Sequence, residues 1–272
     1  MNDIAPTLLA SRSSLPPEGA GLTRGGPSRR PLVDKRTRIK ICGLTREQDV
    51  DAAVAAGVDA VGFVLYELSA RYVSAKRAAE LAARLPPFVT PVLLFVNAST
   101  TEIIAACARI QGALVQLHGD ETPGECLRIA RPFMKAARIP IQAETPDAPL
   151  DFDLVKYAED FKSAQAILLD AHVEGFGGGG KTFNWSLLPP SVNAHLVLSG
   201  GLTPANVGDG MLQVRPRGKT LAVDVSSGVE IAKGIKSPEL ISQFVEAVRA
   251  ADFLIANQVA EKAFEHVPVP TT

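Results

Sequence analysis

Cysteine, aromatic residues and unbalanced charge are all scarce in this sequence. Three cysteines stand among 272 residues, at positions 42, 107 and 126. Their odd number and wide spacing argue against a disulfide framework or a metal site and suit a reducing compartment, so we expect a cytoplasmic protein. A net charge of −1 removes the general basic field that nucleic-acid binding needs. No run approaches the roughly 18 apolar residues of a membrane span.

The two ends of the chain differ in composition from its middle. Residues 1–37 are rich in Pro, Ser, Gly and Arg and lack a hydrophobic period. We interpret them as a disordered leader or an over-extended start, with an organelle transit peptide as the alternative. Residues 38–256 are predicted to form the folded catalytic domain, and residues 257–272 a peripheral tail.

Short apolar runs alternate with helical patterns throughout the middle of the chain. Eight runs are predicted as strands: Arg38–Ile41, Ala60–Leu65, Pro91–Val96, Leu114–Leu117, Phe133–Ala137, Ala166–Leu169, His195–Leu198 and Leu221–Val225. The predicted helices are Arg46–Ala56, Ala75–Leu85, Thr101–Arg109, Pro123–Ala130, Leu150–Tyr157, Pro204–Met211 and Pro238–Ala251. The expected N-caps are Thr45, Ser74, Thr100, Thr122, Thr203 and Ser237.

This repeated strand–helix order predicts an α/β fold, a single (β/α)8 barrel. An open doubly wound sheet is the alternative, but it would call for a dinucleotide fingerprint after the first strand, and Cys42–Thr45 is not one.

Polar residues gather after the predicted strands, where barrels place their active sites. Cys42 follows the first strand and could act as a base or nucleophile, or fill core space like most free cysteines. Asp170 follows the sixth and could donate a proton or form an ion pair. Arg71 could bind a carboxylate or lie on the surface. Asp224 could accept a substrate N–H or pair with a lysine. Lys40 precedes Cys42 by two residues on the same face of the strand and could favour its thiolate.

Glycine-rich loops follow the last three strands. Glycines let backbone amides converge on an anion, and barrels often bind phosphate after strands seven and eight. Five of the six residues from Gly175 to Gly180 are glycine. The predicted phosphate ligands are Gly179, Gly180, Gly200, Gly201, Ser227 and Gly228. Val229–Ala232 is expected to form a short helix beside them, and His172–Phe176 a lid.

Six segments, taken together and in order, form a specific set. They are Ile39–Thr45, Gln116–Gly119, Leu168–Asp170, Gly178–Trp185, Leu198–Val207 and Asp224–Glu230. This set resembles the phosphoribosylanthranilate isomerase family of tryptophan biosynthesis. The resemblance covers about Arg38 to Ala251 and departs from the usual family pattern at Gly179, Asn184 and Ser199.

The resemblance implies an Amadori rearrangement without metal or organic cofactor. Asp170 would be the general acid that opens the sugar ring, and Cys42 the general base. Arg71 would bind the anthranilate carboxylate, and Asp224 would lie near the substrate nitrogen.

Two other functions stay open. A related isomerase would act on a phosphoribosyl aminoimidazole, although such barrels typically place Asp where Cys42 stands. A non-catalytic phosphate-binding or scaffold protein is the second. We expect a small phosphorylated substrate, no nucleic-acid or membrane partner, and a monomer.

Overall fold

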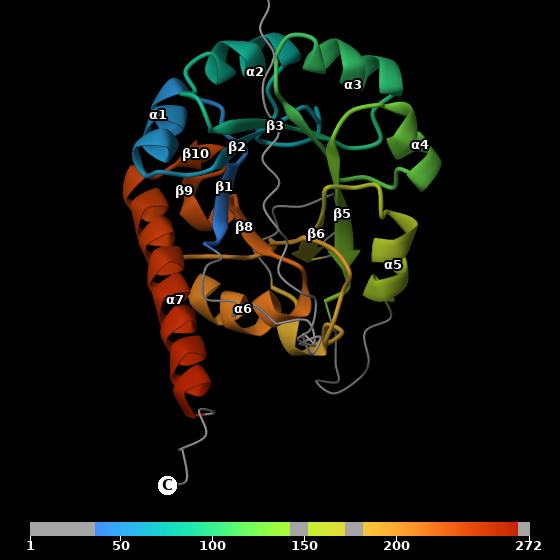
Figure 1. Ribbon diagram of the computed structural model, residues 1–272. Helices are drawn as coiled ribbons and strands as arrows, with labels where there is room; N and C mark the ends of the chain where they lie inside the picture. The colour runs from blue at the N-terminus through green and yellow to red at the C-terminus, as the bar shows by residue number, and fades with distance from the viewer. Residues whose placement is uncertain (1–35, 142–151, 172–181, 266–272) are drawn as a thin grey trace, which may run out of the picture. The chain divides into compact units, whose positions relative to one another are not determined.

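The computed structural model describes residues 36–141, 152–171 and 182–265. Eight parallel strands follow one another around a closed barrel in chain order, with helices outside it (Figure 1). The strands are β1 (Arg38–Cys42), β2 (Ala60–Val64), β3 (Thr90–Phe95), β4 (Leu114–Leu117), β5 (Phe133–Ile139), β6 (Ala166–Ala171), β7 (Leu196–Leu198) and β8 (Leu221–Val225). The predicted single (β/α)8 barrel is therefore confirmed.

The helices lie where the hydrophobic period predicts them, with shifted ends. They are α1 (Glu47–Ala55), α2 (Ala75–Ala82), α3 (Thr100–Cys107), α4 (Pro123–Arg128), α5 (Leu154–Asp160), α6 (Val207–Val214) and α7 (Pro238–Glu265). Three expected caps are confirmed. The Ser74 hydroxyl accepts from the Arg77 amide, Thr122 forms a capping box with Glu125, and the Ser237 hydroxyl accepts from the Leu240 amide at the start of α7. Helix α7 continues well past the predicted end at Ala251.

Three expected N-caps were wrong. Helix α3 is capped by Ser99 rather than Thr100. The N-cap of α1 is Arg46, because the Thr45 hydroxyl donates to the Gly234 carbonyl instead of capping. Helix α6 begins at Val207 rather than Pro204, because the loop before it is closed by its own contacts.

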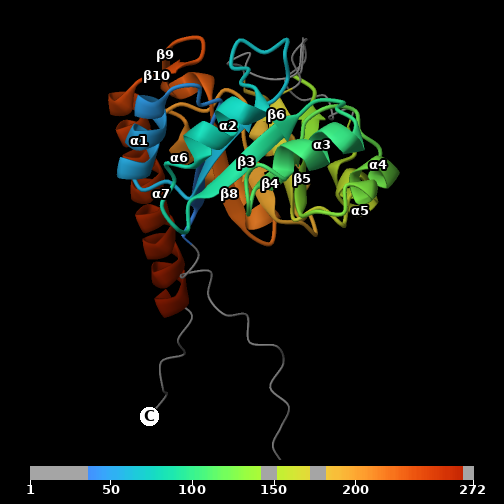
Figure 2. The ribbon, with the colours of Figure 1, turned by 90° about the horizontal axis from the view of Figure 1, so that it is seen from above.

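The segment after β8 also differs from the prediction. In place of a helix over Val229–Ala232, a single 3₁₀ turn (η4, Ser227–Val229) leads into strand β9 (Glu230–Ala232). Strand β9 pairs antiparallel with β10 (Ile235–Lys236). This hairpin lies beside the end of the barrel at the top of Figure 2.

Alternation along the strands divides the core into two layers. The larger layer lies between strands and helices and contains residues such as Ile41, Leu169 and Val223. The smaller one fills the barrel interior and includes Met134 and Leu168. The next inward-facing residue after an interior one such as Leu168 lies two positions later in the chain. Its side chain therefore reaches the carboxyl end of the strand. No helix in the described residues is long and apolar enough to span a membrane.

Candidate active site

Strand β1 brings a lysine and a cysteine to the inside of the barrel. Lys40 and Cys42 lie two residues apart and share one face, whereas Ile39 and Ile41 enter the outer core. Both inward side chains need the space left by Gly62 on β2. A Cβ at Gly62 would lie 2.7 Å from Cys42 Sγ and 3.1 Å from Lys40 Cε. The missing side chain on β2 is thus what makes room for the thiol.

The Lys40 ammonium is paired with a carboxylate of the neighbouring strand. Its Nζ lies 2.9 Å from Asp224 Oδ1, and the two side chains are 6% and 5% exposed. Register places the two residues opposite each other where β1 closes the barrel against β8. Of the two roles left open for Asp224, the lysine pairing is therefore present in the structure.

Burial and charge act in opposite directions on Cys42. Desolvation raises the pKa of the thiol, while the Lys40 ammonium acts to lower it and the Asp224 carboxylate adds to the rise. Lys236 also acts to lower this pKa, with a smaller effect than Lys40. The thiol therefore sits where a nearby cation offsets part of the cost of forming a buried thiolate.

Asp170 ends the inward face of β6 and is held by a chain of two side chains, one from β4 and one from the residue that follows it. Its Oδ2 lies 3.0 Å from Nε2 of His118, and Nδ1 of His118 lies 2.9 Å from Nε2 of Gln116. Its Oδ1 accepts from the amide of Ala171 at 3.0 Å. All three side chains of the chain are buried.

This chain suits either protonation state of the acid. With the Gln116 amide nitrogen donating to Nδ1, the neutral His118 ring carries its proton on Nε2 and donates to an ionised Asp170. Rotating the amide lets its oxygen accept from Nδ1–H, so that Nε2 can accept from a protonated Asp170. His118 thus contacts the candidate acid directly.

Asp224 interacts electrostatically with groups on both sides of the barrel mouth, which is the end of the barrel where the strands finish. Burial raises its pKa, Lys40 acts to lower it, and the Asp170 carboxylate acts to raise it. Asp224 thus responds to groups on both β1 and β6. Cys42, Asp224 and Asp170 therefore form a set of buried ionisable groups at the carboxyl end of the barrel strands.

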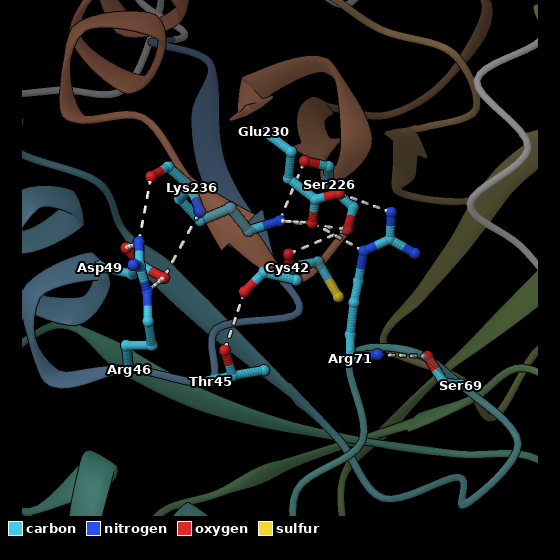
Figure 3. Close-up of polar contacts among 10 residues, drawn as sticks. Cys42, Thr45, Arg46, Asp49, Ser69, Arg71, Ser226, Glu230 and Lys236 are labelled. Carbon is cyan, nitrogen blue, oxygen red and sulfur yellow. Dashed lines mark hydrogen bonds and ion pairs between the residues drawn. The ribbon is translucent and has the colours of Figure 1, made fainter. Parts of the chain in front are cut away.

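Arg71 reaches the same end of the barrel from the loop after β2. Its stem lies over Gly43, where a Cβ would come within 2.5 Å of Arg71 Cδ. Its Nε and Nη2 donate to Glu230 at 2.7 and 2.8 Å, and the guanidinium lies beside Cys42 in Figure 3. Arg71 is therefore not a free surface arginine.

Glycines in the loops after β7 and β8 allow close packing at this end of the barrel. Gly200 has φ +79°, and a Cβ there would lie 2.5 Å from the amide nitrogen of Ala171. A Cβ at Gly228 would lie 1.8 Å from the carbonyl oxygen of Leu202. Gly201, Ser227 and Gly228 thus belong to two tightly packed neighbouring loops. The other predicted phosphate ligands, Gly179 and Gly180, and the predicted lid His172–Phe176 lie outside the described residues.

Several polar partners at this site were not predicted from the sequence. His118 contacts the acid and is itself bonded to Gln116, and Glu230 holds Arg71 and is itself bonded to Lys236. The i, i+2 spacing of Gln116 and His118 at the end of a strand was the available signal for the first pair. Within the described residues, no group of three or more His, Cys, Asp or Glu side chains could hold a metal ion.

The fold and this set of groups define a (β/α)8-barrel enzyme with a buried thiol, a buried carboxyl group and an arginine around one mouth. The family model for N-(5'-phosphoribosyl)anthranilate (PRA) isomerase matches residues 39–247. The chain therefore belongs to the N-(5'-phosphoribosyl)anthranilate isomerase family.

Individual relatives agree with this assignment. The chain is 62% identical over 221 residues to the N-(5'-phosphoribosyl)anthranilate isomerase of Methylibium petroleiphilum, covering 81% of this chain and 98% of that one. The Leptothrix cholodnii enzyme is 60% identical, over 81% of this chain and 94% of the relative.

Solved structures are similar over the same region. The phosphoribosyl anthranilate isomerase of Thermotoga maritima is 39% identical with a TM-score of 0.67, covering 79% of this chain and 99% of that one. Another isomerase structure, in complex with reduced 1-(o-carboxyphenylamino)-1-deoxyribulose 5-phosphate, is 36% identical with a TM-score of 0.64, with the same coverage.

Proposed function

We propose that this chain converts N-(5-phosphoribosyl)anthranilate to 1-(2-carboxyphenylamino)-1-deoxyribulose 5-phosphate, a step of tryptophan biosynthesis. Membership of the family supports the reaction. The observation that carries the assignment of residues is the convergence of Cys42 and Asp170 on one barrel mouth, both buried, with Lys40 acting on the thiol and His118 bonded to the carboxyl group.

Asp170 acts as the general acid in this proposal. Its carboxyl group gives a proton to the furanose ring oxygen, the C1–O bond breaks, and the nitrogen lone pair forms a C=N iminium. His118, bonded to Oδ2, fixes the carboxyl group and stabilises the carboxylate that remains. The proton leaving Asp170 thus becomes the hydroxyl proton of the opened sugar.

Cys42 acts as the general base. Its thiolate removes the proton from sugar C2, and the electron pair of that C–H bond forms the C1=C2 double bond of a neutral enolamine. The iminium accepts those electrons, so a strong base is not needed. Lys40 favours the thiolate before this transfer. Moving the proton of the C2 hydroxyl to C1 then gives the ketone, with no net gain or loss of atoms.

Arg71 and Asp224 bind the anthranilate part of the substrate. Arg71 offers planar N–H groups to its carboxylate. Asp224 uses Oδ1 for Lys40, and within the described residues Oδ2 makes no hydrogen bond, which leaves it for the substrate N–H. We place the phosphate at Gly179, Gly180, Gly200, Gly201, Ser227 and Gly228.

Two broader expectations accompany this function. The free, buried state of all three cysteines supports the cytoplasm as the compartment. The predicted monomer stays a prediction.

Turnover of the phosphoribosylated anthranilate by the purified chain tests the reaction. Substrate fluorescence should decay when the chain is added, and the product should be consumed by the next enzyme of the pathway. Failure to convert this substrate, with the barrel folded, would contradict the proposal.

A further inference from the structure

Three charged side chains form a buried chain beside Cys42. Glu230 opens strand β9, Lys236 belongs to β10, and Arg71 comes from the loop after β2. The Lys236 ammonium and Arg71 Nε both lie 2.7 Å from Glu230 Oε1. The side chains of Arg71, Glu230 and Lys236 are 11%, 5% and 0% exposed. Figure 3 shows them converging from three separate segments.

The contact with Glu230 uses one edge of the Arg71 guanidinium. Nε and one N–H of Nη2 face the Glu230 carboxylate. A guanidinium has a second edge, formed by Nη1 and the other N–H of Nη2, that also matches a carboxylate bidentately. Within the described residues, Nη1 of Arg71 has no hydrogen-bond partner. Glu230 thus occupies the side edge of the guanidinium, formed by Nε and Nη2. The end edge, formed by Nη1 and Nη2, stays available to a second anion.

Lys236 connects Glu230 to Ser226, the residue that follows strand β8. Its ammonium donates to the Ser226 carbonyl at 2.9 Å and contacts the Ser226 hydroxyl at 3.3 Å. That hydroxyl in turn donates to the Cys42 carbonyl at 3.0 Å. Arg71 is therefore oriented through Glu230 and Lys236 against the ends of both β8 and β1, the strand that carries the thiol.

The charges of this group leave one positive charge over. Arg71 and Lys236 supply two cations, and Glu230 supplies one carboxylate. Burying such a group is costly unless another anion completes it. A substrate carboxylate at the end edge of Arg71 would supply such an anion, and the Cys42 thiolate, which also attracts Arg71 and Lys236, is another.

We propose that Glu230 and Lys236 are positioning residues that hold the end edge of Arg71 toward the barrel mouth and make the site selective for an arylamine sugar phosphate bearing a carboxylate. The inference rests on the proposed function, in which Arg71 binds that carboxylate. Neither Glu230 nor Lys236 touches the substrate. They act by fixing the direction of the fork, so their loss reduces carboxylate recognition more than it reduces catalysis.

Two ligands that differ by one group test this selectivity on the full chain. One is reduced 1-(o-carboxyphenylamino)-1-deoxyribulose 5-phosphate, and the other is the same compound without the carboxyl group. Calorimetry gives both Kd values, and their ratio is the carboxylate preference. We expect Glu230→Gln to lower this ratio about tenfold, with the Kd of the carboxyl-free ligand changed less than about twofold. Lys236→Met should lower the ratio by about threefold, because Glu230 still holds Arg71.

Kinetics give a second readout. For Glu230→Gln, KM for the substrate should rise about tenfold while kcat falls less than about threefold, as expected when binding rather than chemistry is lost. Asp252→Asn is the matched control, because it removes a partly buried, ion-paired carboxylate on α7. It should leave the ratio unchanged.

The outcomes separate the two proposals. An unchanged ratio in Glu230→Gln, or equal weakening of both ligands, would overturn the positioning role. If Glu230→Gln does not fold, Glu230→Asp keeps the charge with a shorter reach and should lower the ratio about threefold, and an unchanged ratio there is equally contradictory. A wild-type chain that shows no carboxylate preference, or no turnover, would instead contradict the proposed function itself.

Discussion

At the scale of single residues, the site is dominated by the balance of charge around Cys42. Burial alone would keep the thiol protonated, since it raises the pKa. Lys40 opposes this effect, and Asp224 partly cancels Lys40 because it carries the opposite charge at 2.9 Å. Cys42 must lose its thiol proton before it can act as a base, so its activity depends on this balance of burial and charge.

The two members of the Lys40–Asp224 pair should shift the pH profile in opposite directions. The thiolate is the active form of the base, so kcat/KM should rise with pH as Cys42 loses its proton. Lys40→Met removes a charge that lowers the Cys42 pKa, and the rising limb should therefore move to higher pH. Asp224→Asn removes a charge that raises it, and the limb should move to lower pH.

The pair is its own control, because each variant breaks the same buried ion pair at a cost of about 3–5 kcal/mol in unfolding free energy. Rate measurements between mildly acidic and alkaline pH give the limb in each variant. Shifts of both limbs in the same direction would contradict the assignment of Cys42 as the titrating base.

At the scale of elements, local signals in the sequence located the strands and helices well, but the segments after β7 and β8 less well. Strand ends depend on the alternation of apolar residues, and caps such as Ser74 depend on neighbours three residues away. Strand β9 was mistaken for a helix because its pairing with β10 is what makes it extended.

The contacts that complete the site lie beyond the reach of local patterns. His118 and Asp170 are 52 residues apart, and Arg71 and Glu230 are 159 apart. The positions of Cys42, Asp170 and Asp224 at the ends of predicted strands predicted that they lie at one end of a barrel, because parallel strands end together. They could not say which polar partner each side chain would find there.

The loop after β8 gives an element-scale test of the phosphate site. A Cβ at Gly228 would overlap the Leu202 carbonyl, so Gly228→Ala must displace one of two loops that we assign to phosphate binding. We expect KM to rise about tenfold, with weaker inhibition by inorganic phosphate. Steady-state kinetics with and without phosphate measures both effects.

Gly124→Ala on α4 is the matched control for that change. The nearest heavy atom to a Cβ there is Arg128 Nη1 at 3.8 Å, an ordinary contact. Activity should be unchanged. The free energy of unfolding should rise by up to about 1 kcal/mol, because alanine has a higher helix propensity than glycine. An unaltered KM and phosphate inhibition in Gly228→Ala would argue against this loop as a phosphate ligand.

At the scale of the whole molecule, one group of stabilising contacts lies at the end of the barrel opposite to the chemistry. Thr37, just before β1, donates its amide and hydroxyl to Asp252 of α7 at 2.9 and 2.6 Å, and Arg215 also pairs with Asp252. Arg249 of α7 donates to the Thr37 carbonyl at 2.9 Å. These contacts tie the start of the first strand to the last helix, whereas Cys42 lies at the other end of that strand.

Asp252→Asn should therefore lower stability without affecting catalysis. The amide keeps the volume of the side chain but loses its charge-assisted hydrogen bonds, at a cost of about 1–3 kcal/mol in unfolding free energy. Urea denaturation measures that loss, and kcat/KM should stay within about twofold of the wild type. A fall in kcat/KM with no change in the denaturation midpoint would contradict this separation.

The most direct test of the account is turnover by Cys42→Ala and Asp170→Asn in the anthranilate fluorescence assay. Each variant should lose activity by at least about a thousandfold, because the rearrangement needs both a base at sugar C2 and an acid at the ring oxygen. Each should still bind reduced 1-(o-carboxyphenylamino)-1-deoxyribulose 5-phosphate and keep the circular dichroism spectrum of the folded barrel. A kcat close to that of the wild type in either folded variant would contradict the acid–base assignment.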